Sequence, residues 1–476
     1  MHNNYAKFLI DQIESCNIQA HFAYIDSKLR LTYKELAKKI NGTMHALNQQ
    51  HLVAGDYVIL LPTDPTQFPI LFLSCIALGI IPLLIDDNTS TSTVDSLCLQ
   101  IGAKTILTNI APVDTEQALL YHQHTDDSVA FMLCTSGTTG NPKIVKHKHR
   151  CFFDIINATR GRYNINNTSV ILATSKMSYG YGLFLNIIIG LASRCTVVLL
   201  DKTPTPTSIC KKLEKYKITH FFTNPTMLSW IVNKSTISKL NTELQFVISS
   251  SEPLPPTLIT RFYNKFRINL YNGYGASELL SNVIINDNLH NRFGSIGKPI
   301  SGFEFLIVDQ NGSQCGPNQP GVLLCKAPNI CIGYLGRETS VDQDFPNGWF
   351  HTNDIVYIDE DGFYFYVGRK GQHVKISGQW TSAAEIENVI YSSGLVHECT
   401  VIFDINKHGL TSSTAYIVPC DNTKILPYEL RANLLLSYSS HLVPKEIRLM
   451  KSLPRTSRNK RIIDPLILEN YYVNQL

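Results

Sequence analysis

Two long apolar segments, residues 69–85 and 183–200, place the strongest constraint on how this chain can fold. A membrane span needs about 20 uninterrupted apolar residues. The first segment is interrupted by Gly79 and Pro82, and the second carries Arg194 in its interior. Each segment therefore predicts a buried helix, a turn and a buried strand. This alternation is typical of an α/β fold whose helices cover a sheet.

Shorter runs of apolar and β-branched residues predict the strands of this fold. After residue 300 these runs alternate with Asn-Gly, Gly-Pro and Asp-Gly turns, which predicts a small β-rich subdomain of hairpins. A compact mixed segment of helices and strands begins after Gly371, so we place a domain boundary at residues 369–371. The strands predicted in the first 300 residues are 56–61, 129–134, 170–173, 195–200, 220–223, 246–249 and 268–271.

A run of hydroxyl residues and glycines, T-S-G-T-T-G-N-P-K, follows the strand predicted at residues 129–134. Glycines let backbone amides turn towards an anion, the hydroxyls add neutral donors, and the lysine adds a positive charge. The spacing differs from the G-x-x-x-x-G-K-[ST] of the Walker loop. Taken alone, a plain Ser/Thr/Gly linker is the alternative. The residues predicted to bind phosphate are Thr135, Ser136, Gly137, Thr138, Thr139, Gly140 and Lys143.

This T-S-G-T-T-G-x-P-K run resembles the signature of the adenylate-forming superfamily, which includes acyl- and aryl-CoA synthetases, peptide-synthetase adenylation domains and luciferases. The resemblance extends from the first quarter of the chain to its last residues. It implies an α/β fold with a large N-terminal AMP-binding domain, residues 1–370, made of two α/β sheet subdomains and a small β-barrel-like subdomain. A small mobile α+β domain, residues 371–476, would follow a hinge at Gly371. ATP and Mg²⁺ are the implied cofactors.

Two further segments resemble the adenine-binding motifs of this superfamily. The sequence N-G-Y-G-A-S-E at residues 272–278 resembles N-x-Y-G-x-T-E, and the S-E-P turn at 251–253 stands where relatives have a turn against adenine. An amide can accept from the adenine amino group, a tyrosine offers a flat face, and a carboxylate suits Mg²⁺. A Gly-rich turn with one solvated glutamate is the plain alternative. The residues predicted here are Ser251, Glu252, Pro253, Asn272, Gly273, Tyr274, Gly275, Ser277 and Glu278, with Glu278 also the metal ligand.

The sequence G-W-F-H-T-N-D at residues 348–354 resembles the ribose-binding motif G-W-[FY]-x-T-G-D. The resemblance implies that Asp354 accepts both ribose hydroxyls and that Arg369 reaches the ribose or the α-phosphate. Asn353 replaces the usual glycine, and asparagine tolerates a positive φ better than most residues.

The C-terminal residues resemble the two catalytic loops of the superfamily. The sequence K-I-S-G-Q-W at 375–380 resembles the thioester loop and most resembles the benzoate-CoA ligase branch, so Lys375, Gly378 and Trp380 are implied in the second half-reaction. The sequence P-R-T-S-R-N-K resembles P-x-T-x-x-G-K and makes Lys460 the candidate catalytic lysine. A carboxylate and an α-phosphate are both anions, so their reaction needs such a cation.

The segment S-K-M-S-Y-G-Y-G-L at residues 175–183 resembles the acyl pocket of aryl-CoA ligases. It lacks the acidic residue with which amino-acid-activating relatives hold an ammonium group. The resemblance makes Tyr179 an aromatic gate, followed by Gly180, and turns Tyr181 towards the acyl group. We therefore expect a short, flat, apolar slot that takes a small aromatic carboxylic acid.

Composition argues against several other functions. A formal net charge of +4 without a basic, aromatic-rich tract disfavours nucleic acid as a partner. The twelve cysteines lack zinc-ligand spacing and suggest free thiols in a reducing cytoplasm. Residues 1–20 lack an apolar signal core. We therefore expect a cytoplasmic protein without a membrane span.

Three functions remain open at this point. The first is an acyl- or aryl-CoA ligase that forms an acyl-adenylate and then a thioester with CoA. The second is a stand-alone adenylation enzyme that loads an acyl or aminoacyl group onto the phosphopantetheine of a carrier protein. The third is a catalytically weak AMP- or acyl-adenylate-binding protein, suggested by the departures at Asn353, Gly371 and Asn459.

Overall fold

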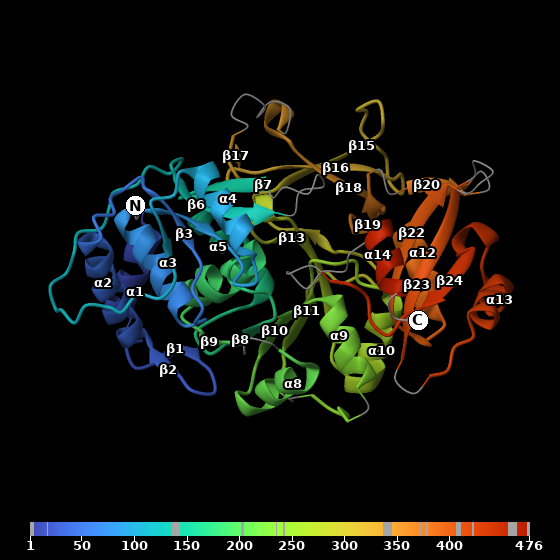
Figure 1. Ribbon diagram of the computed structural model, residues 1–476, viewed down its shortest axis with the longest axis horizontal. Coiled ribbons are helices and arrows are strands. Elements are labelled where there is room, and N and C mark those ends of the chain that lie inside the picture. The colour runs from blue at the N-terminus through green and yellow to red at the C-terminus, as the bar shows by residue number, and fades with distance from the viewer. Residues whose placement is uncertain are drawn as a thin grey trace.

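The computed structural model describes residues 4–16, 18–135, 143–200, 204–234, 236–240, 243–336, 345–370, 373–376, 379–405, 411–420, 423–455 and 464–473. Figure 1 shows the N-terminal helices at one end of the molecule and the C-terminal elements at the other. Among the described residues, no helix is both long enough and apolar enough to cross a membrane.

One sheet has six strands in the order β17-β7-β6-β4-β3-β5. The four strands from β6 to β5 are parallel, whereas β7 and β17 run antiparallel to their neighbours. The Thr135–Lys143 run therefore connects two antiparallel strands of one sheet, β6 and β7. The strands are β3 (Tyr57–Leu60), β4 (Ile81–Leu84), β5 (Thr105–Leu107), β6 (Val129–Thr135), β7 (Lys143–Lys148) and β17 (Gly333–Tyr334).

A second sheet has nine strands in the order β14-β13-β12-β11-β10-β8-β9-β1-β2. Its six central strands, from β12 to β1, are parallel. The strands are β1 (Phe22–Ile25), β2 (Arg30–Thr32), β8 (Val170–Ala173), β9 (Thr196–Val198), β10 (His220–Thr223), β11 (Phe246–Ser249), β12 (Leu270–Gly275), β13 (Asn282–Ile285) and β14 (Lys298–Pro299). The prediction at 268–271 began two residues early and ended four residues early, because β12 extends through the glycine-rich segment.

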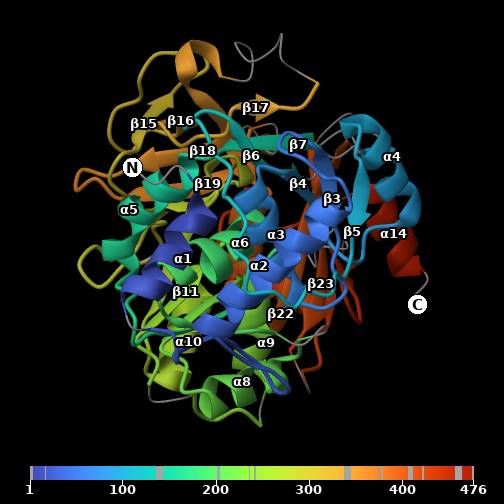
Figure 2. The same cartoon turned by 90° about the vertical axis from the view of Figure 1, so that its left-hand side faces the viewer.

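Helices cover both sheets, and the first of them stand in front in Figure 2. They are α1 (Tyr5–Ser15), α2 (Tyr33–Gln49), α3 (Gln67–Leu78), α4 (Thr91–Ile101), α5 (Cys151–Tyr163), α6 (Gly180–Leu183), α7 (Gly190–Ala192), α8 (Pro206–Lys215), α9 (Pro225–Asn233) and α10 (Pro256–Phe266). The apolar segment at 69–85 forms most of α3, a turn at Gly79 with φ of 79°, and β4. Its predicted helix, turn and strand are confirmed.

The second apolar segment contains a π-helical stretch, η1 (Phe184–Ile189), between α6 and α7. The π geometry turns backbone carbonyls out of the usual helical hydrogen bonds. The Tyr24 hydroxyl donates to the Asn186 carbonyl at 2.9 Å, and the Tyr5 hydroxyl donates to the Ile188 carbonyl at 2.6 Å. These buried hydroxyls explain why the predicted plain helix is a π-helix here.

The remaining elements form a four-stranded antiparallel sheet and a C-terminal part with its own core. The four strands, which lie along the top of Figure 1, are β15 (Glu304–Val308), β16 (Gly321–Lys326), β18 (Phe350–Ile358) and β19 (Tyr364–Arg369). The C-terminal strands are β20 (His373–Ile376), β21 (Gln379–Ser382), β22 (Val396–Ile405), β23 (Thr411–Pro419) and β24 (Glu446–Leu449), and the helices are α12 (Ala383–Ser392), α13 (Pro427–Ser437) and α14 (Pro465–Val473). The domain boundary stays a prediction, since Gly371 lies outside the described residues.

A capping box starts α2. The Thr32 hydroxyl accepts from the Glu35 amide at 3.2 Å, and the Glu35 carboxylate accepts from the Thr32 amide at 2.8 Å. We expect Thr32→Ala to lower the free energy of unfolding by about 1 kcal/mol, because the Glu35 amide loses the hydroxyl that accepts its hydrogen bond. Urea unfolding followed by far-UV circular dichroism measures this change. The exposed Thr91 in the first turn of α4 gives a matched Thr→Ala control, for which we expect a change within about 0.5 kcal/mol.

Candidate active site

The loops that follow the parallel strands of both sheets border one cavity of about 1170 Å³. In the six-stranded sheet these loops follow β3, β4 and β6, and in the nine-stranded sheet they follow β8, β9, β10, β11 and β12. Loops at the carboxyl ends of parallel strands are the usual ligand-binding positions in such sheets. The cavity therefore lies where the carboxyl edges of the two sheets face each other.

One wall of the cavity combines Lys143, Tyr334 and Glu278. The Tyr334 hydroxyl donates to Glu278 Oε1 at 2.7 Å, and Lys143 Nζ lies 4.8 Å from the centroid of the Tyr334 ring. Thr135 lines the cavity at the end of β6, whereas Ser136, Gly137, Thr138, Thr139 and Gly140 lie outside the described residues. The structure thus brings the predicted phosphate-binding lysine and the predicted metal ligand to one tyrosine.

A buried histidine supports the turn that carries Ser277 and Glu278. His147 is 0% exposed, and its Nε2 donates to the Ser277 carbonyl at 2.9 Å. Burial lowers the pKa of His147 to about 4, so the ring is neutral at pH 7. The neutral ring stacks on Phe131 at 5.0 Å between centroids. His147 therefore joins the phosphate-loop hairpin to the turn that carries Glu278.

The Glu278 carboxylate fits a magnesium ion that is shared with a nucleotide. Mg²⁺ is typically bound by one or two carboxylates together with phosphate oxygens and waters. Within the part of the chain that the structure describes, no group of three or more His, Cys, Asp or Glu side chains could hold a metal ion. A magnesium ion at Glu278 would therefore take most of its ligands from phosphate and water.

Asp354 lies on strand β18 of the four-stranded sheet and is 5% exposed. Its Oδ2 accepts from the Tyr274 hydroxyl at 2.7 Å, and its Oδ1 accepts from Arg369 Nε at 3.1 Å across the β18–β19 pair. Burial raises the pKa of the Asp354 carboxyl above its ordinary value, although Arg369 and Tyr274 favour the charged form. Asp354 and Arg369 both line the cavity, and the neighbouring Asn353 adopts a positive φ of 59°. The prediction that Asn353 tolerates this conformation is confirmed.

Only some of the predicted adenine-binding residues line the cavity. Ser251, Glu252 and Gly275 line the cavity. Ser251 has a φ of 72°, a left-handed conformation that favours glycine. A Cβ at Gly275 would lie 2.1 Å from the Ser281 carbonyl oxygen, so only glycine fits. Among the described residues the cavity lining does not include Pro253, Asn272, Gly273 or Tyr274.

Asn272 and Tyr274 are both buried and form hydrogen bonds within the protein. Asn272 is 6% exposed, and its amide donates to the Ser295 carbonyl at 3.3 Å. Tyr274 is 8% exposed, and its hydroxyl is held by Asp354. Their direct contacts with adenine stay predictions, while the structure assigns Tyr274 a contact with the predicted ribose-binding carboxylate.

Tyr179, Gly180 and Tyr181 all line the cavity, as expected for an acyl pocket. The Tyr181 hydroxyl accepts from Asn282 Nδ2 at 3.1 Å, and Asn282 Oδ1 accepts from the Ser250 hydroxyl at 2.6 Å. These three side chains line the cavity together and add a polar wall to the predicted apolar slot.

The Tyr179 hydroxyl donates to Asp86 at the carboxyl end of β4. Lys176 Nζ lies 2.9 Å from Asp86 Oδ1 and 2.6 Å from Asp87 Oδ1. The tyrosine hydroxyl and the lysine hold the pKa of the Asp86 carboxyl below its usual range, against the opposing effect of burial. This network fixes the predicted gate tyrosine to the six-stranded sheet.

The site side chains that were not predicted from the sequence include Asp86, Asp87, His147, Lys176, Ser250, Asn282 and Tyr334. Asp86 could have been found, because it directly follows a predicted buried strand. Tyr334 and Asn282 carry no local signal, because their hydrogen-bond partners come from other parts of the chain. The predicted thioester residues Lys375 and Trp380 pair across the β20–β21 hairpin. Their side chains, together with Gly371, Gly378 and Lys460, lie outside the described part of the chain.

The buried neutral state of His147 predicts a pH effect on stability. The unfolded ring has a pKa of about 6.5 and the folded ring about 4, so the unfolded state binds more protons as the pH falls from 6.5 towards 4. The stability that the neutral ring contributes is present above pH 6.5 and is lost on acidification. We expect His147→Gln to flatten the pH dependence of the unfolding free energy between pH 6.5 and 5 by about 1 kcal/mol per pH unit. His21→Gln, at an exposed histidine, is the control; parallel curves for parental protein and His147→Gln would contradict the assignment.

Over 482 residues the chain is 26% identical to 3-hydroxybenzoate–CoA ligase of Aromatoleum sp. (strain CIB), covering 92% of this chain and 91% of that protein. Over 479 residues it is 25% identical to benzoate–CoA ligase of Thauera aromatica, covering 92% and 90%. The solved structure of a benzoate CoA ligase from Burkholderia xenovorans LB400 superposes with a TM-score of 0.87 at 22% identity, covering 96% of this chain and 98% of that chain. An anthranilate CoA ligase in complex with anthranoyl-AMP superposes with a TM-score of 0.89 at 20% identity, covering 96% and 95%.

These comparisons confirm the predicted fold class and the predicted enzyme class, the AMP-forming acid–thiol ligases. The predicted roles of individual site residues stay predictions. Residues 117–335 match the family described as AMP-binding enzyme. Along 92% of its length the chain is also similar to benzoate- and hydroxybenzoate-CoA ligases.

Proposed function

We propose that this protein activates a small aromatic carboxylic acid with ATP and transfers the acyl group to the thiol of CoA. The observation that carries the proposal is the single cavity lined by Lys143, Glu278, Asp354, Arg369 and Tyr181. It joins groups suited to phosphate, Mg²⁺ and ribose to a wall suited to an acyl group. Relatives that align along nearly their whole length are aryl-CoA ligases, which supports the same reaction.

In the first step a carboxylate oxygen of the acid attacks the α-phosphorus of ATP. The bond from this phosphorus to the oxygen that bridges to the β-phosphate breaks, and pyrophosphate leaves. Lys143 would neutralise the leaving pyrophosphate, and Mg²⁺ held by Glu278 would supply charge stabilisation when bound. Asp354 and Arg369 would hold the ribose end, and Lys460 would bring the cation that the approach of two anions requires.

In the second step the sulfur of the thiol attacks the acyl carbon, and AMP leaves with the bonding electron pair. The proton of the thiol is released to solvent. We infer that the C-terminal part rotates about Gly371 between the steps and presents the hairpin that carries Lys375 and Trp380. Rotation lets one cavity face serve two different transition states.

The polar wall bears on which acids fit. Tyr181, Asn282 and Ser250 form a chain of hydrogen bonds along the acyl side of the cavity. An aromatic ring can lie against the face of Tyr181, while a hydroxyl or amino substituent can exchange hydrogen bonds with this chain. Benzoic acids with small polar substituents therefore belong in the first panel of substrates.

Two alternatives are tested by the same assays. Loading of a carrier protein would need a phosphopantetheine acceptor in place of CoA, and it remains an outcome of the second assay. A catalytically weak AMP-binding protein was suggested by Asn353. The observed φ of 59° at Asn353 keeps the turn next to Asp354 in the conformation that glycine would adopt, which weakens this alternative.

The proposal predicts acid-dependent exchange of labelled pyrophosphate into ATP. Benzoate, 3-hydroxybenzoate, 4-hydroxybenzoate and anthranilate are the panel, and CoA is then added to measure thioester formation. We expect Glu278→Gln to lower the exchange rate by about 10²–10³, because a charge that stabilises the transition state is lost. The proposal would be overturned if the parental protein showed no pyrophosphate exchange with any of these acids or with aliphatic acids.

The polar wall predicts a selective effect on the acid. We expect Tyr181→Phe to raise the KM for the acid about tenfold, because the Asn282 amide loses its buried acceptor. The KM for ATP should stay within about twofold, since the hydroxyl lies on the acyl side. Tyr263→Phe, at a 46%-exposed tyrosine of α10, is the matched control. An equal rise in both KM values would contradict this assignment.

A further inference from the structure

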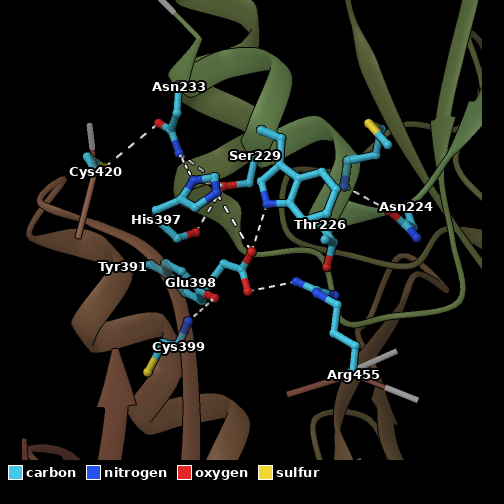
Figure 3. Close-up of polar contacts among 12 residues, drawn as sticks. Asn224, Thr226, Ser229, Asn233, Tyr391, His397, Glu398, Cys399, Cys420 and Arg455 are labelled. Atoms are coloured by element: carbon cyan, nitrogen blue, oxygen red, sulfur yellow. Dashed lines mark hydrogen bonds and ion pairs between the residues drawn. The ribbon is translucent and has the colours of Figure 1, made fainter. Parts of the chain in front are cut away.

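We propose that Glu398 is a positioning residue that couples the C-terminal part to the cavity wall and thereby sets the rate of adenylate formation. The inference rests on the proposed function and deepens it. Glu398 lies on β22 and is 7% exposed. It meets helix α9 of the N-terminal part, as Figure 3 shows.

Three side chains form a closed cluster at this contact. Glu398 Oε1 accepts from Trp230 Nε1 at 2.7 Å, and Glu398 Oε2 accepts from Arg455 Nη2 at 2.7 Å. The guanidinium of Arg455 also lies 5.1 Å from the centroid of the Trp230 ring. The carboxylate therefore binds both partners while the cation stacks on the indole.

A second set of contacts fixes the same two elements. The Ser229 hydroxyl donates to the His397 carbonyl at 3.0 Å, and the Asn233 amide contacts the His397 ring. Ser229, Trp230 and Asn233 lie on one helix, and His397 precedes Glu398 on one strand. The contact thus joins one helix face to one strand, and it fixes an orientation rather than a single point.

The cluster reaches the cavity through Trp230. Trp230 lines the cavity, and α9 begins directly after Asn224, which lines it as well. A shift of β22 relative to α9 would therefore displace Trp230 and change the cavity wall.

The position of Arg455 assigns the effect to the first half-reaction. Arg455 precedes Lys460 by five residues, and an extended chain spans at most about 3.5 Å per residue, or about 17 Å. Holding Arg455 against Trp230 therefore keeps the predicted catalytic lysine within reach of the cavity. The predicted thioester residues Lys375 and Trp380 belong to a different hairpin, β20–β21, and the proposed rotation would separate Glu398 from Trp230 before they act.

The test compares matched substitutions in the full-length protein. Glu398→Gln keeps an acceptor for Trp230 but turns an amide donor or a neutral oxygen towards Arg455. Arg455→Ala removes the same ion pair from the other side. Glu446→Gln is the control, because Glu446 is 53% exposed and pairs with Arg448 at 2.7 Å within the C-terminal part. All three are measured in both half-reactions.

We expect Glu398→Gln and Arg455→Ala each to lower acid-dependent pyrophosphate exchange by about 10²-fold, the scale of a misplaced catalytic group. CoA-dependent consumption of supplied acyl-adenylate should stay within about twofold of the parental rate. The double variant should be no slower than the slower single variant, because both act through one contact. Equal losses in both half-reactions, or parental exchange rates in both variants, would overturn the proposal.

A measurement independent of turnover separates this proposal from the proposed function. We expect faster amide hydrogen exchange in α9, residues 225–233, for Glu398→Gln than for the parental protein or Glu446→Gln. Unchanged protection of α9 would overturn the role of Glu398 even if the enzyme is active. If the parental protein activates none of the acids, the proposed function fails. The hydrogen-exchange data would still show whether Glu398 holds α9 in place.

Discussion

The meeting of two sets of parallel strands at their carboxyl ends is the constraint on which the rest of the structure depends. Each parallel strand must be followed by a loop that leaves the sheet at the same edge, so polar residues from distant parts of the sequence collect there. In this chain β4 delivers Asp86, β11 delivers Ser251, and β12 delivers Glu278 to one cavity. The two apolar segments form α3 and η1, whose buried side chains belong to the hydrophobic core that supports the sheets.

Local sequence was sufficient for the elements and for the residues that act close to their own motif. The strands at 170–173, 220–223 and 246–249 coincide with β8, β10 and β11, because short apolar runs between helix-length segments have few other solutions. Thr32 caps α2 as a Thr-x-x-Glu pattern predicts. By contrast, the π-helical stretch depends on the buried hydroxyls of Tyr5 and Tyr24, which come from elsewhere in the chain and leave no local signal.

The same contrast between local signals and distant partners applies to the site residues. Lys143, Glu278 and Asp354 were found because their motifs are contiguous, but the partners that orient them come from other strands. Tyr334 binds Glu278 from β17, and Tyr274 binds Asp354 from β12. Two turns of the site keep a backbone conformation that favours glycine without having glycine there. Ser251 and Asn353 both adopt a positive φ.

Asp354 and Glu398 are both buried carboxylates with similar partners, but the proposed rotation places different demands on them. Each is paired with an arginine and accepts from an aromatic donor; for Asp354 these are Arg369 and Tyr274, with the Tyr366 hydroxyl as a further donor at 3.5 Å. Those partners all belong to the N-terminal part, so this pair can stay rigid while nucleotide is held.

Glu398 and Arg455 both belong to the C-terminal part, and only the indole of Trp230 belongs to the other side. The proposed rotation therefore leaves the ion pair intact and breaks contacts with neutral groups of α9: the Trp230 hydrogen bond and stacking, and the contacts of Ser229 and Asn233 with His397. Breaking a buried ion pair costs about 3–5 kcal/mol, whereas a hydrogen bond to a charged group contributes about 1.5–3 kcal/mol. The smaller cost suits a contact that must form for one half-reaction and separate for the next.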